Sequence, residues 1–247
     1  MVKWTKIWQM IFNPSKCYVL TITKKRKTIN FNYNINGHIL ESVAPNPYLG
    51  AELTNTMSWD KQVNKVVTKG NKALGFIRRN VGSCPEAVKK QAYLALVRPH
   101  LEYACSAWDP HLQKHIYQIE MVQRRAARFI KSNYSREPGT VTTLLEELNL
   151  TPLEIRRKVA RITLFHKAIH ERVAIPIPTH IIKPRRTSRL HQPNTKRYVQ
   201  IRPNKDIYKY SFFPRTIRDW NKLPDELLEI ESSEEFKTKL TKLLCSG

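Results

Sequence analysis

The stretch HLQKHIYQIEMVQRRAARFIK, residues 111–131, decides the fold class of this chain. Its apolar side chains recur every three or four residues, which is the period of an α-helix with one buried face. They are Leu112, Ile116, Ile119, Val122, Ala126 and Ile130. The cations Arg124, Arg125, Arg128 and Lys131 lie around the other face. The stretch therefore predicts a helix with an apolar side and a basic side.

Helical periodicity extends beyond this stretch, from Ser58 to about Glu171. Ser58 suits the N-cap position because its hydroxyl can accept from amides of the first turn. Pro85 suits the start of a helix that we expect to end near Pro99. One helix is predicted to begin at residue 58, with an apolar stripe that extends to residue 77. Further helices are predicted over 85–99, 111–131, 141–148, 152–171 and 233–244.

The first 57 residues have another pattern and predict a small α+β part. Trp4, Ile7, Trp8 and Ile11 have helical spacing. Residues 17–22 carry β-formers on both faces, which predicts a central strand with a neighbour on each side. Residues 29–35 alternate strictly between apolar and polar, which predicts a half-buried strand.

Two turn signals follow these strands. Asn36-Gly37 can supply positive φ at both centres of a type I′ turn, so a β-hairpin is predicted there. The segment PNPYLGAEL, residues 45–53, predicts another short extended piece. Gly50 within it is interpreted as a bulge or a close approach of another backbone.

The charge balance indicates a polyanionic partner. The chain has 43 Lys and Arg against 20 Asp and Glu, a net charge of +23. Such a potential favours nucleic acid. The alternative is a solvated basic surface with no such partner. The 41% hydrophobic content is sufficient for packed cores.

The segment from Ala174 to about Lys209 predicts an extended basic arm. It combines five prolines with a dense run of Lys and Arg and has no sustained period. In the following SFFPRTIRDWNKLP, residues 211–224, Phe212 and Trp220 are predicted to pin the arm to the helices rather than to stack on bases.

Several classes of protein and site are disfavoured by the sequence. No stretch reaches the roughly 18–20 apolar residues of a membrane span, and charges interrupt the N-terminal apolar positions, unlike a signal peptide. We therefore expect an intracellular protein, nuclear or cytoplasmic, that is neither secreted nor transmembrane. The four cysteines stand singly, and His111 and His115 have no further ligand at metal-site spacing. No metal site is predicted.

Seven motifs occur in a fixed order: WTKIWQMIFNPSKC, PYLG, LGFIRRN, LVRPHLEYACSAWDP, IEMVQRRAARFI, LEIRRKVARITLFHKAIH and SFFPRTIRDWNKLP. Together they resemble the C-terminal third of the reverse transcriptase polyprotein of non-LTR retrotransposons, closest to the jockey-like LINE group. The resemblance covers nearly the whole chain, and its most specific elements are RPHLEYACSAWDP and WNKLP.

The resemblance implies a mainly α fold with a small N-terminal α+β part. Residues 1–57 correspond to the end of the palm domain, with a helix, strands and a primer-grip-like hairpin. Residues 58–136 correspond to a helical thumb-like bundle. Residues 137–247 correspond to a helical and extended basic C-terminal region.

The resemblance also implies what the chain lacks. In the family, the Asp-Asp box of the palm holds the Mg²⁺ ions of polymerisation, and this sequence has no Asp-Asp pair. We therefore expect a truncated remnant with no metal, no cofactor and no polymerase activity of its own, although the full-length family enzyme uses Mg²⁺. Lys16 in NPSKC matches the family lysine that lies near the nucleotide phosphates.

Binding of RNA, or of an RNA–DNA template-primer duplex, is the function that the resemblance implies for the remaining residues. Tyr48, Leu49 and Gly50 match the primer grip. The predicted phosphate-binding side chains are Arg78, Arg79, Arg124, Arg125, Arg128, Lys131, Arg156 and Arg157. Phosphate contacts do not read sequence, so binding without sequence preference is expected.

Two alternatives remain open at the level of the sequence. The first alternative to nucleic-acid binding is a helical protein-interaction module, whose charge serves solubility. The second is a thumb fragment that completes a separately encoded palm. In the second case the missing palm is itself a partner.

Overall fold

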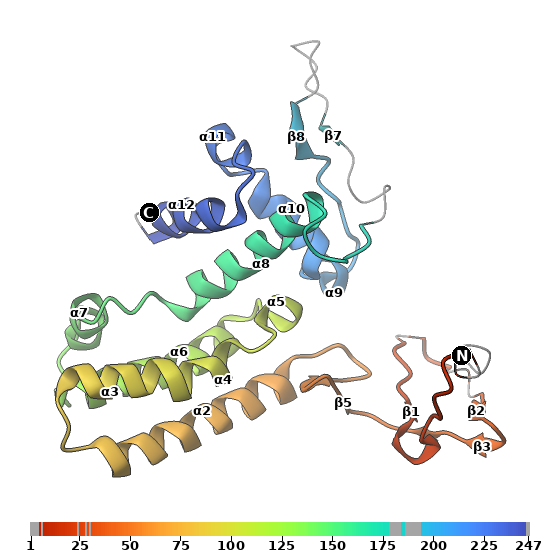
Figure 1. The fold of residues 1–247 in the computed structure, drawn as a ribbon, viewed down its shortest axis with the longest axis horizontal. Coiled ribbons are helices and arrows are strands. Elements are labelled where there is room, and N and C mark those ends of the chain that lie inside the picture. Colours follow the sequence, from red (N-terminus) through yellow and green to blue (C-terminus); the bar gives the residue numbers. More distant parts are fainter. Residues whose placement is uncertain are drawn as a thin grey trace. The chain divides into compact units, whose positions relative to one another are not determined.

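The computed structural model describes residues 5, 7–23, 25–27, 29, 31–177, 184–185 and 194–245. The chain is mostly helical with a few short N-terminal strands, which confirms the predicted fold class (Figure 1). Contacts divide it into two compact units, Met1–Asn64 and Lys65–Gly247.

The first unit contains three two-stranded sheets. Strand β1 (Tyr18–Val19) pairs in parallel with β4 (Glu41–Ser42). Strand β2 (Asn34–Ile35) pairs antiparallel with β3 (His38–Ile39), and β5 (Asn46–Tyr48) pairs antiparallel with β6 (Ala51–Leu53). A 3₁₀ turn at Pro14–Lys16 precedes β1 and is capped by Asn13, whose side chain accepts from the Ser15 amide.

Both antiparallel pairs are closed by two-residue turns with positive φ at both centres, the type I′ geometry. The φ values are 52° and 82° at Asn36 and Gly37, and 46° and 85° at Leu49 and Gly50. The predicted hairpin at Asn36-Gly37 is confirmed. Gly50 lies in a tight turn rather than at a bulge, because residues 48 and 51 pair directly across it.

Three further predictions for this unit are wrong. Over the described residues of 29–35 the predicted half-buried strand is absent: only Asn34 and Ile35 belong to a strand, and Ile29 and Phe31 are 78% and 68% exposed. Strand β1 has two residues and one partner within the described part of the unit. The buried face of the N-terminal helix is also wrong: Thr5 and Ile7 are helical, but Ile7 and Ile11 are 76% and 94% exposed and Trp8 lies in a turn, while Trp4 lies outside the described residues. Alternation and amphipathicity produce regular elements only where a second layer covers the apolar face.

The helical part begins with α2 (Asp60–Val81), where Ser58 Oγ accepts from the Asp60 amide at 3.2 Å, as expected of a cap. It continues with α3 (Glu86–Ala92), a π-helical segment (Tyr93–Val97), α4 (Arg98–Glu102), α5 (Cys105–Trp108), α6 (Gln113–Lys131), α7 (Thr140–Glu147) and α8 (Leu153–Ile169). The predicted helices over 111–131, 141–148 and 152–171 are confirmed within a few residues.

The helix that starts after Pro85 does not end near Pro99, so that prediction is wrong. It widens into the π-helical segment, in which the Arg98 amide donates to the Tyr93 carbonyl, and it runs on to Glu102. Proline lacks the amide for the next turn, and a π turn is one of the ways in which a helix accommodates that loss.

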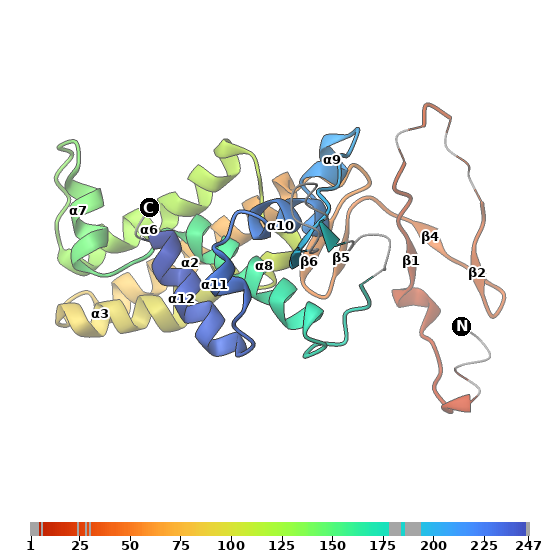
Figure 2. The same ribbon diagram turned by 90° about the horizontal axis from the view of Figure 1, so that it is seen from above.

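The C-terminal part consists of α9 (Asp206–Lys209), α10 (Phe212–Trp220), α11 (Asp225–Leu228) and α12 (Ser233–Cys245), which confirms the closing helix. Helix α12 packs across α8 (Figure 1, Figure 2). Between them lies an aromatic core, in which the ring centroids of Phe165 and Phe236 are 5.2 Å and 5.6 Å from that of Trp220.

The basic arm is described only in part, since residues 178–183 and 186–193 lie outside the described residues. Strands β7 (Pro184–Arg185) and β8 (Asn194–Tyr198) pair antiparallel. Trp220 is 1% exposed and donates from Nε1 to the Lys196 carbonyl at 2.8 Å, so it pins this segment as predicted.

Helices α5 and α6, from the predicted segment 58–136, contact α8, from the predicted segment 137–247. Helices of both segments therefore lie in the second unit. The division into 1–57, 58–136 and 137–247 stays a prediction about the origin of these segments.

Candidate nucleic-acid interface

Helix α6 presents one apolar face to the core and one polar face outward, as predicted, except that Leu112 precedes the helix and is 43% exposed. Ile116, Ile119, Val122, Ala126 and Ile130 are all at most 5% exposed. Arg125 on the other side is exposed, and Arg124 and Arg128 are half-buried. Arg128 Nε is buried and has no acceptor in the described part of the chain.

Helix α2 passes close to α6 at Gly70. A Cβ atom at Gly70 would lie 2.7 Å from Leu101 Cδ2 and 3.3 Å from Val122 Cγ1, so a larger residue would force the Leu101 side chain to shift. Beside it, Arg125 Nη1 donates to Asn71 Oδ1 at 3.2 Å. This bond places a cation of α6 directly beside the outer surface of α2.

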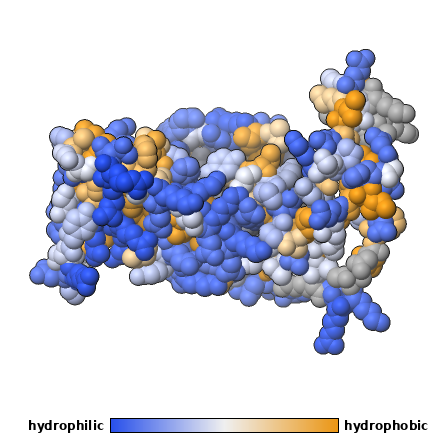
Figure 3. All heavy atoms as spheres, turned by 90° about the horizontal axis from the view of Figure 1, so that it is seen from below, coloured by the Kyte–Doolittle hydropathy of each residue, from blue (hydrophilic) through white to orange (hydrophobic). Residues whose placement is uncertain are grey.

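The end of α2 adds Arg78 and Arg79, which are both exposed. We call Arg78, Arg79, Arg124, Arg125 and Arg128 the α2–α6 basic face. None of the five is in an ion pair within the described ranges. Lys69 and Lys72 of α2 are also exposed, and the outer side of α2 is mostly hydrophilic in Figure 3.

Lys131, a predicted phosphate ligand, is instead engaged by two carboxylates. Its Nζ lies 3.2 Å from Glu86 Oε2 and 2.9 Å from Glu147 Oε2. Hydrogen bonds to Glu147 and Glu86 raise the pKa of Lys131 above its ordinary value. Lys131 thus links α3, α6 and α7.

Arg156, also a predicted phosphate ligand, is engaged as well. It forms a two-pronged pair with Glu102, in which Nη2 donates to Oε2 at 3.0 Å and Nε donates to Oε1. A carboxylate that holds the guanidinium fork in this way occupies the geometry that a phosphate would need.

The prediction for Arg157 is wrong, because its side chain is 0% exposed and cannot contact a phosphate. Its Nε donates to Asp109 Oδ1 at 3.3 Å. Burial of an arginine requires such a counter-charge, and none was predicted from the sequence.

Asp109 is the centre of a buried arginine cluster. Its Oδ2 lies 3.2 Å from Arg161 Nε and 3.1 Å from Arg215 Nη1. Arg161 Nη2 in turn donates to Asp219 Oδ2 at 2.7 Å. Burial raises the pKa of Asp219, but the charge and hydrogen bond of Arg161 outweigh this effect and leave the pKa below its ordinary value.

This cluster joins three of the quoted motifs. Asp109 lies in RPHLEYACSAWDP, Arg157 and Arg161 lie in LEIRRKVARITLFHKAIH, and Arg215 and Asp219 lie in SFFPRTIRDWNKLP. The cluster was not predicted from the sequence, although a signal was present. The fully buried side chains Leu153, Arg157, Arg161 and Phe165 recur at intervals of four along α8, so both arginines share a face with core residues.

The palm-like candidates all lie in the first unit. Lys16 is exposed at the end of the 3₁₀ turn. Tyr48 and Leu49 are 64% and 77% exposed at the tip of the β5–β6 hairpin, with Gly50 beside them. The hairpin is real, and a primer-grip role for it stays a prediction.

Residues that could hold a metal ion do not gather in the described part of the chain, where no group of three or more His, Cys, Asp or Glu side chains has suitable geometry. The side chains of that part of the chain therefore do not fit a two-metal polymerase centre. No described helix is long and apolar enough to cross a membrane.

Comparison with known proteins finds a distant relative. The chain is 23% identical over 161 residues to the probable RNA-directed DNA polymerase from transposon X-element of Drosophila melanogaster. The match covers 60% of this chain and 17% of the relative, so the chain spans a small part of that protein. No family model matches, and no solved structure is similar. The similarity supports a protein related to transposon reverse transcriptases.

Proposed function

We propose that this chain binds the sugar-phosphate backbone of RNA or of an RNA–DNA duplex through the α2–α6 basic face, without reading sequence. The observation that carries the proposal is the outer stripe of α6. Three arginines lie within two turns of a helix whose opposite side is core, and no carboxylate of the described residues neutralises them.

Arginines suit this task because the guanidinium fork matches phosphate oxygens. Each phosphate that is neutralised releases counterions, which gives affinity and a dependence on salt but no base discrimination. The relative is named as a probable RNA-directed DNA polymerase, which supports RNA or an RNA–DNA duplex as the class of nucleic acid. We place this chain with the thumb-side and C-terminal segments of a jockey-like LINE polyprotein, as its motifs suggest.

We further propose that the chain does not polymerise on its own. Two-metal phosphoryl transfer requires clustered carboxylates. The sequence has five aspartates, none adjacent to another, and two of them, Asp109 and Asp219, are held by arginines in the buried cluster.

The proposal is tested by titrating the protein with single-stranded RNA and with an RNA–DNA duplex of two unrelated sequences at about 50 and 200 mM salt. We expect equal affinity for the two sequences and a large loss of affinity at the higher salt. Negligible binding at the lower salt, or a clear preference for one sequence, would contradict it.

A second candidate, the completion of a separate palm, is favoured by one observation. Many large apolar side chains of the first unit are exposed, among them Ile7, Trp8, Met10, Ile11, Ile29 and Phe31. Exposed apolar groups in such number are typical of a surface covered by a partner. Mixing the chain with a palm fragment and a primed RNA template tests this candidate, which predicts restored synthesis.

A further inference from the structure

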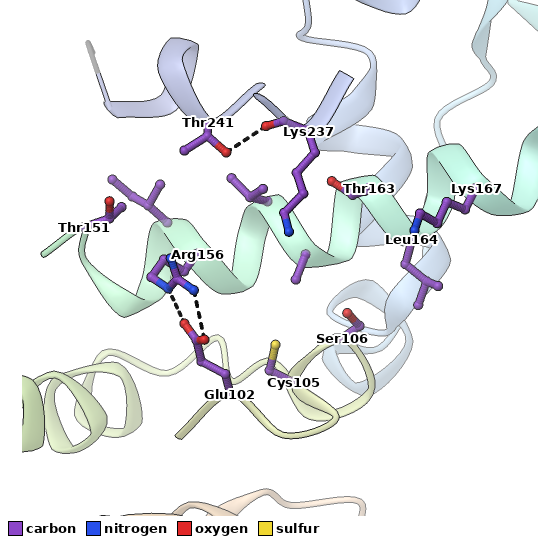
Figure 4. A pocket seen from close by; sticks show the side chains of 13 residues that line it. Glu102, Cys105, Ser106, Thr151, Arg156, Thr163, Leu164, Lys167, Lys237 and Thr241 are labelled. Carbon is purple, nitrogen blue, oxygen red and sulfur yellow. Dashed lines mark hydrogen bonds and ion pairs between the residues drawn. The ribbon is translucent and has the colours of Figure 1, made fainter. Parts of the chain in front are cut away.

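A cavity of about 440 Å³ lies in the second unit between α5, α8 and α12 (Figure 4). Its volume is in the range of about 300–1,000 Å³ that is usual for small-molecule sites. It lies apart from the α2–α6 basic face, since none of the five arginines of that face lines it.

Two lysines at this cavity have no counter-charge. Lys167 of α8 and Lys237 of α12 line it, and neither is in an ion pair within the described ranges. Figure 4 shows Lys237 reaching from α12 toward α8. Glu102, which also lines the cavity, is held by Arg156 and Arg98, so it does not neutralise the lysines.

A buried hydroxyl is left without a partner at the same place. Thr163 is 7% exposed, and its Oγ1 is fully buried with no hydrogen-bond partner in the described structure. A buried polar atom without a partner is costly, so its presence at a cavity indicates a group that a ligand or water can satisfy.

The remaining wall is partly apolar and also carries the polar side chains of Ser106, Thr151, Arg156 and Thr241. Ile155, Val159 and Leu164 of α8 contribute side chains to the lining. The cavity therefore combines two free ammonium groups, an unsatisfied hydroxyl and an apolar floor. An anion attached to a ring with apolar faces and a polar edge fits all three features.

We propose that this cavity binds one nucleoside phosphate unit, with the phosphate at Lys167 and Lys237 and the base against Ile155 and Val159. Thr163 Oγ1 then bonds a polar edge of the base or sugar. This assignment rests on the proposed function and deepens it. The α2–α6 basic face contacts backbone only, and the cavity adds a separate pocket for a single unpaired nucleotide. The nucleotide is either free or part of a single strand.

The test is a calorimetric titration of the whole chain at low salt with uridine 5′-monophosphate, uridine, inorganic phosphate and an octamer of uridylate. The variant Lys167→Gln/Lys237→Gln is compared with Lys158→Gln/Lys239→Gln. The control variant removes two positive charges from the same two helices, α8 and α12, at positions that do not line the cavity. Lys239 is 57% exposed and lies beside Glu235.

We expect the monophosphate to bind the wild type and to bind the cavity variant at least about tenfold more weakly. The control is expected to change by less than about twofold, and uridine and phosphate alone are expected to bind more weakly than the monophosphate. An octamer that binds the cavity variant more weakly than the wild type assigns the site to a single strand, and an octamer that binds both equally assigns it to a free nucleotide.

Two results would overturn the assignment: no monophosphate binding by the wild type, or equal losses in the cavity variant and the control. If the octamer still binds in either case, the basic face stands and only the cavity assignment fails. If the monophosphate binds but neither the octamer nor a duplex does, the proposed strand-binding function fails instead. Phosphate binding as tightly as the monophosphate would remove the role of the apolar floor.

Discussion

Asp109 Oδ2 and Arg161 Nε lie 3.2 Å apart, and both side chains are almost completely buried, at 5% and 2% exposure. This pair connects the loop before α6 to the middle of α8, and Arg215 attaches α10 to the same carboxylate. Asp109 therefore links the segment before α6 to both α8 and α10. Removing a single partner from such a group leaves uncompensated charge in the interior.

Replacement of Asp109 is predicted to destabilise the second unit. Asp109→Asn should lower the free energy of unfolding by about 3–5 kcal/mol, since three arginines would lose their common partner. Urea unfolding followed by circular dichroism measures the change. Asp206→Asn is the control, because Asp206 is 80% exposed and is expected to matter by less than about 1 kcal/mol. Equal effects of the two substitutions would refute a structural role for the cluster.

Two glycines of α2 are predicted to respond oppositely to alanine. At Gly70 a Cβ would lie 2.7 Å from Leu101 Cδ2, whereas at Gly75 the nearest atom, Arg79 Nη1, is 3.6 Å away. Gly75→Ala should stabilise the protein by up to about 1 kcal/mol through helix propensity. Gly70→Ala should destabilise it by about 1–2 kcal/mol, since overpacking exceeds that gain. Thermal unfolding of both variants measures these changes. A higher midpoint for Gly70→Ala than for the wild type would contradict the prediction.

Acid is predicted to destabilise the protein through His166. Its Nε2 donates to the Ile230 carbonyl at 2.7 Å and its Nδ1 lies 3.3 Å from Ser233 Oγ. Burial lowers the pKa of His166 below its ordinary value, so the neutral ring is the form that folds. The unfolded chain binds the proton more readily, and stability should fall as the pH drops from about 7 through about 6.5.

The variant His166→Gln isolates this effect, because glutamine retains a donor for Ile230 but does not titrate. Its unfolding free energy should vary less between about pH 7.5 and pH 5.5 than that of the wild type. Burial also lowers the pKa of His111 and His170, which leaves a residual slope. An unchanged pH dependence would show that His166 is not responsible.

Cys105 is predicted to be the least reactive of the four cysteines. Burial, with a smaller contribution from Glu102, raises the pKa of its thiol to about 11. Only the thiolate is nucleophilic, so at about pH 8 roughly one thiol in a thousand is reactive. Alkylation with iodoacetamide followed by mass spectrometry should modify the exposed Cys245 first and Cys105 only after unfolding. Early modification of Cys105 would contradict its burial.

The helices were predictable because their signal is local. The apolar period of α6 and α8 depends on neighbours three and four residues away, and it placed both helices to within a few residues. The prediction that a helix ends near Pro99 was wrong because the π-helical segment that accommodates this proline depends on the geometry of the whole segment. The strand expected over 29–35 failed because alternation alone supplies no covering layer for Ile29 and Phe31.

The candidate site was predictable only in part. Arg125 and Arg157 look alike in the sequence, as basic residues in doublets on amphipathic helices. Their fates differ because Asp109, at a sequence separation of 48 from Arg157, supplies the counter-charge that permits burial. Long-range pairing of this kind is not encoded in any local pattern, whereas the outward direction of Arg125 follows from the helical period of α6 itself.

The salt dependence of duplex binding tests the role of the α2–α6 basic face most directly. The variant Arg124→Gln/Arg125→Gln/Arg128→Gln should bind an RNA–DNA duplex more weakly than the wild type. Its log–log salt slope should be smaller by up to about 0.9 for each phosphate that the variant no longer neutralises. Lys158→Gln/Lys239→Gln should leave the slope unchanged. An unaltered slope in the triple arginine variant would contradict the account.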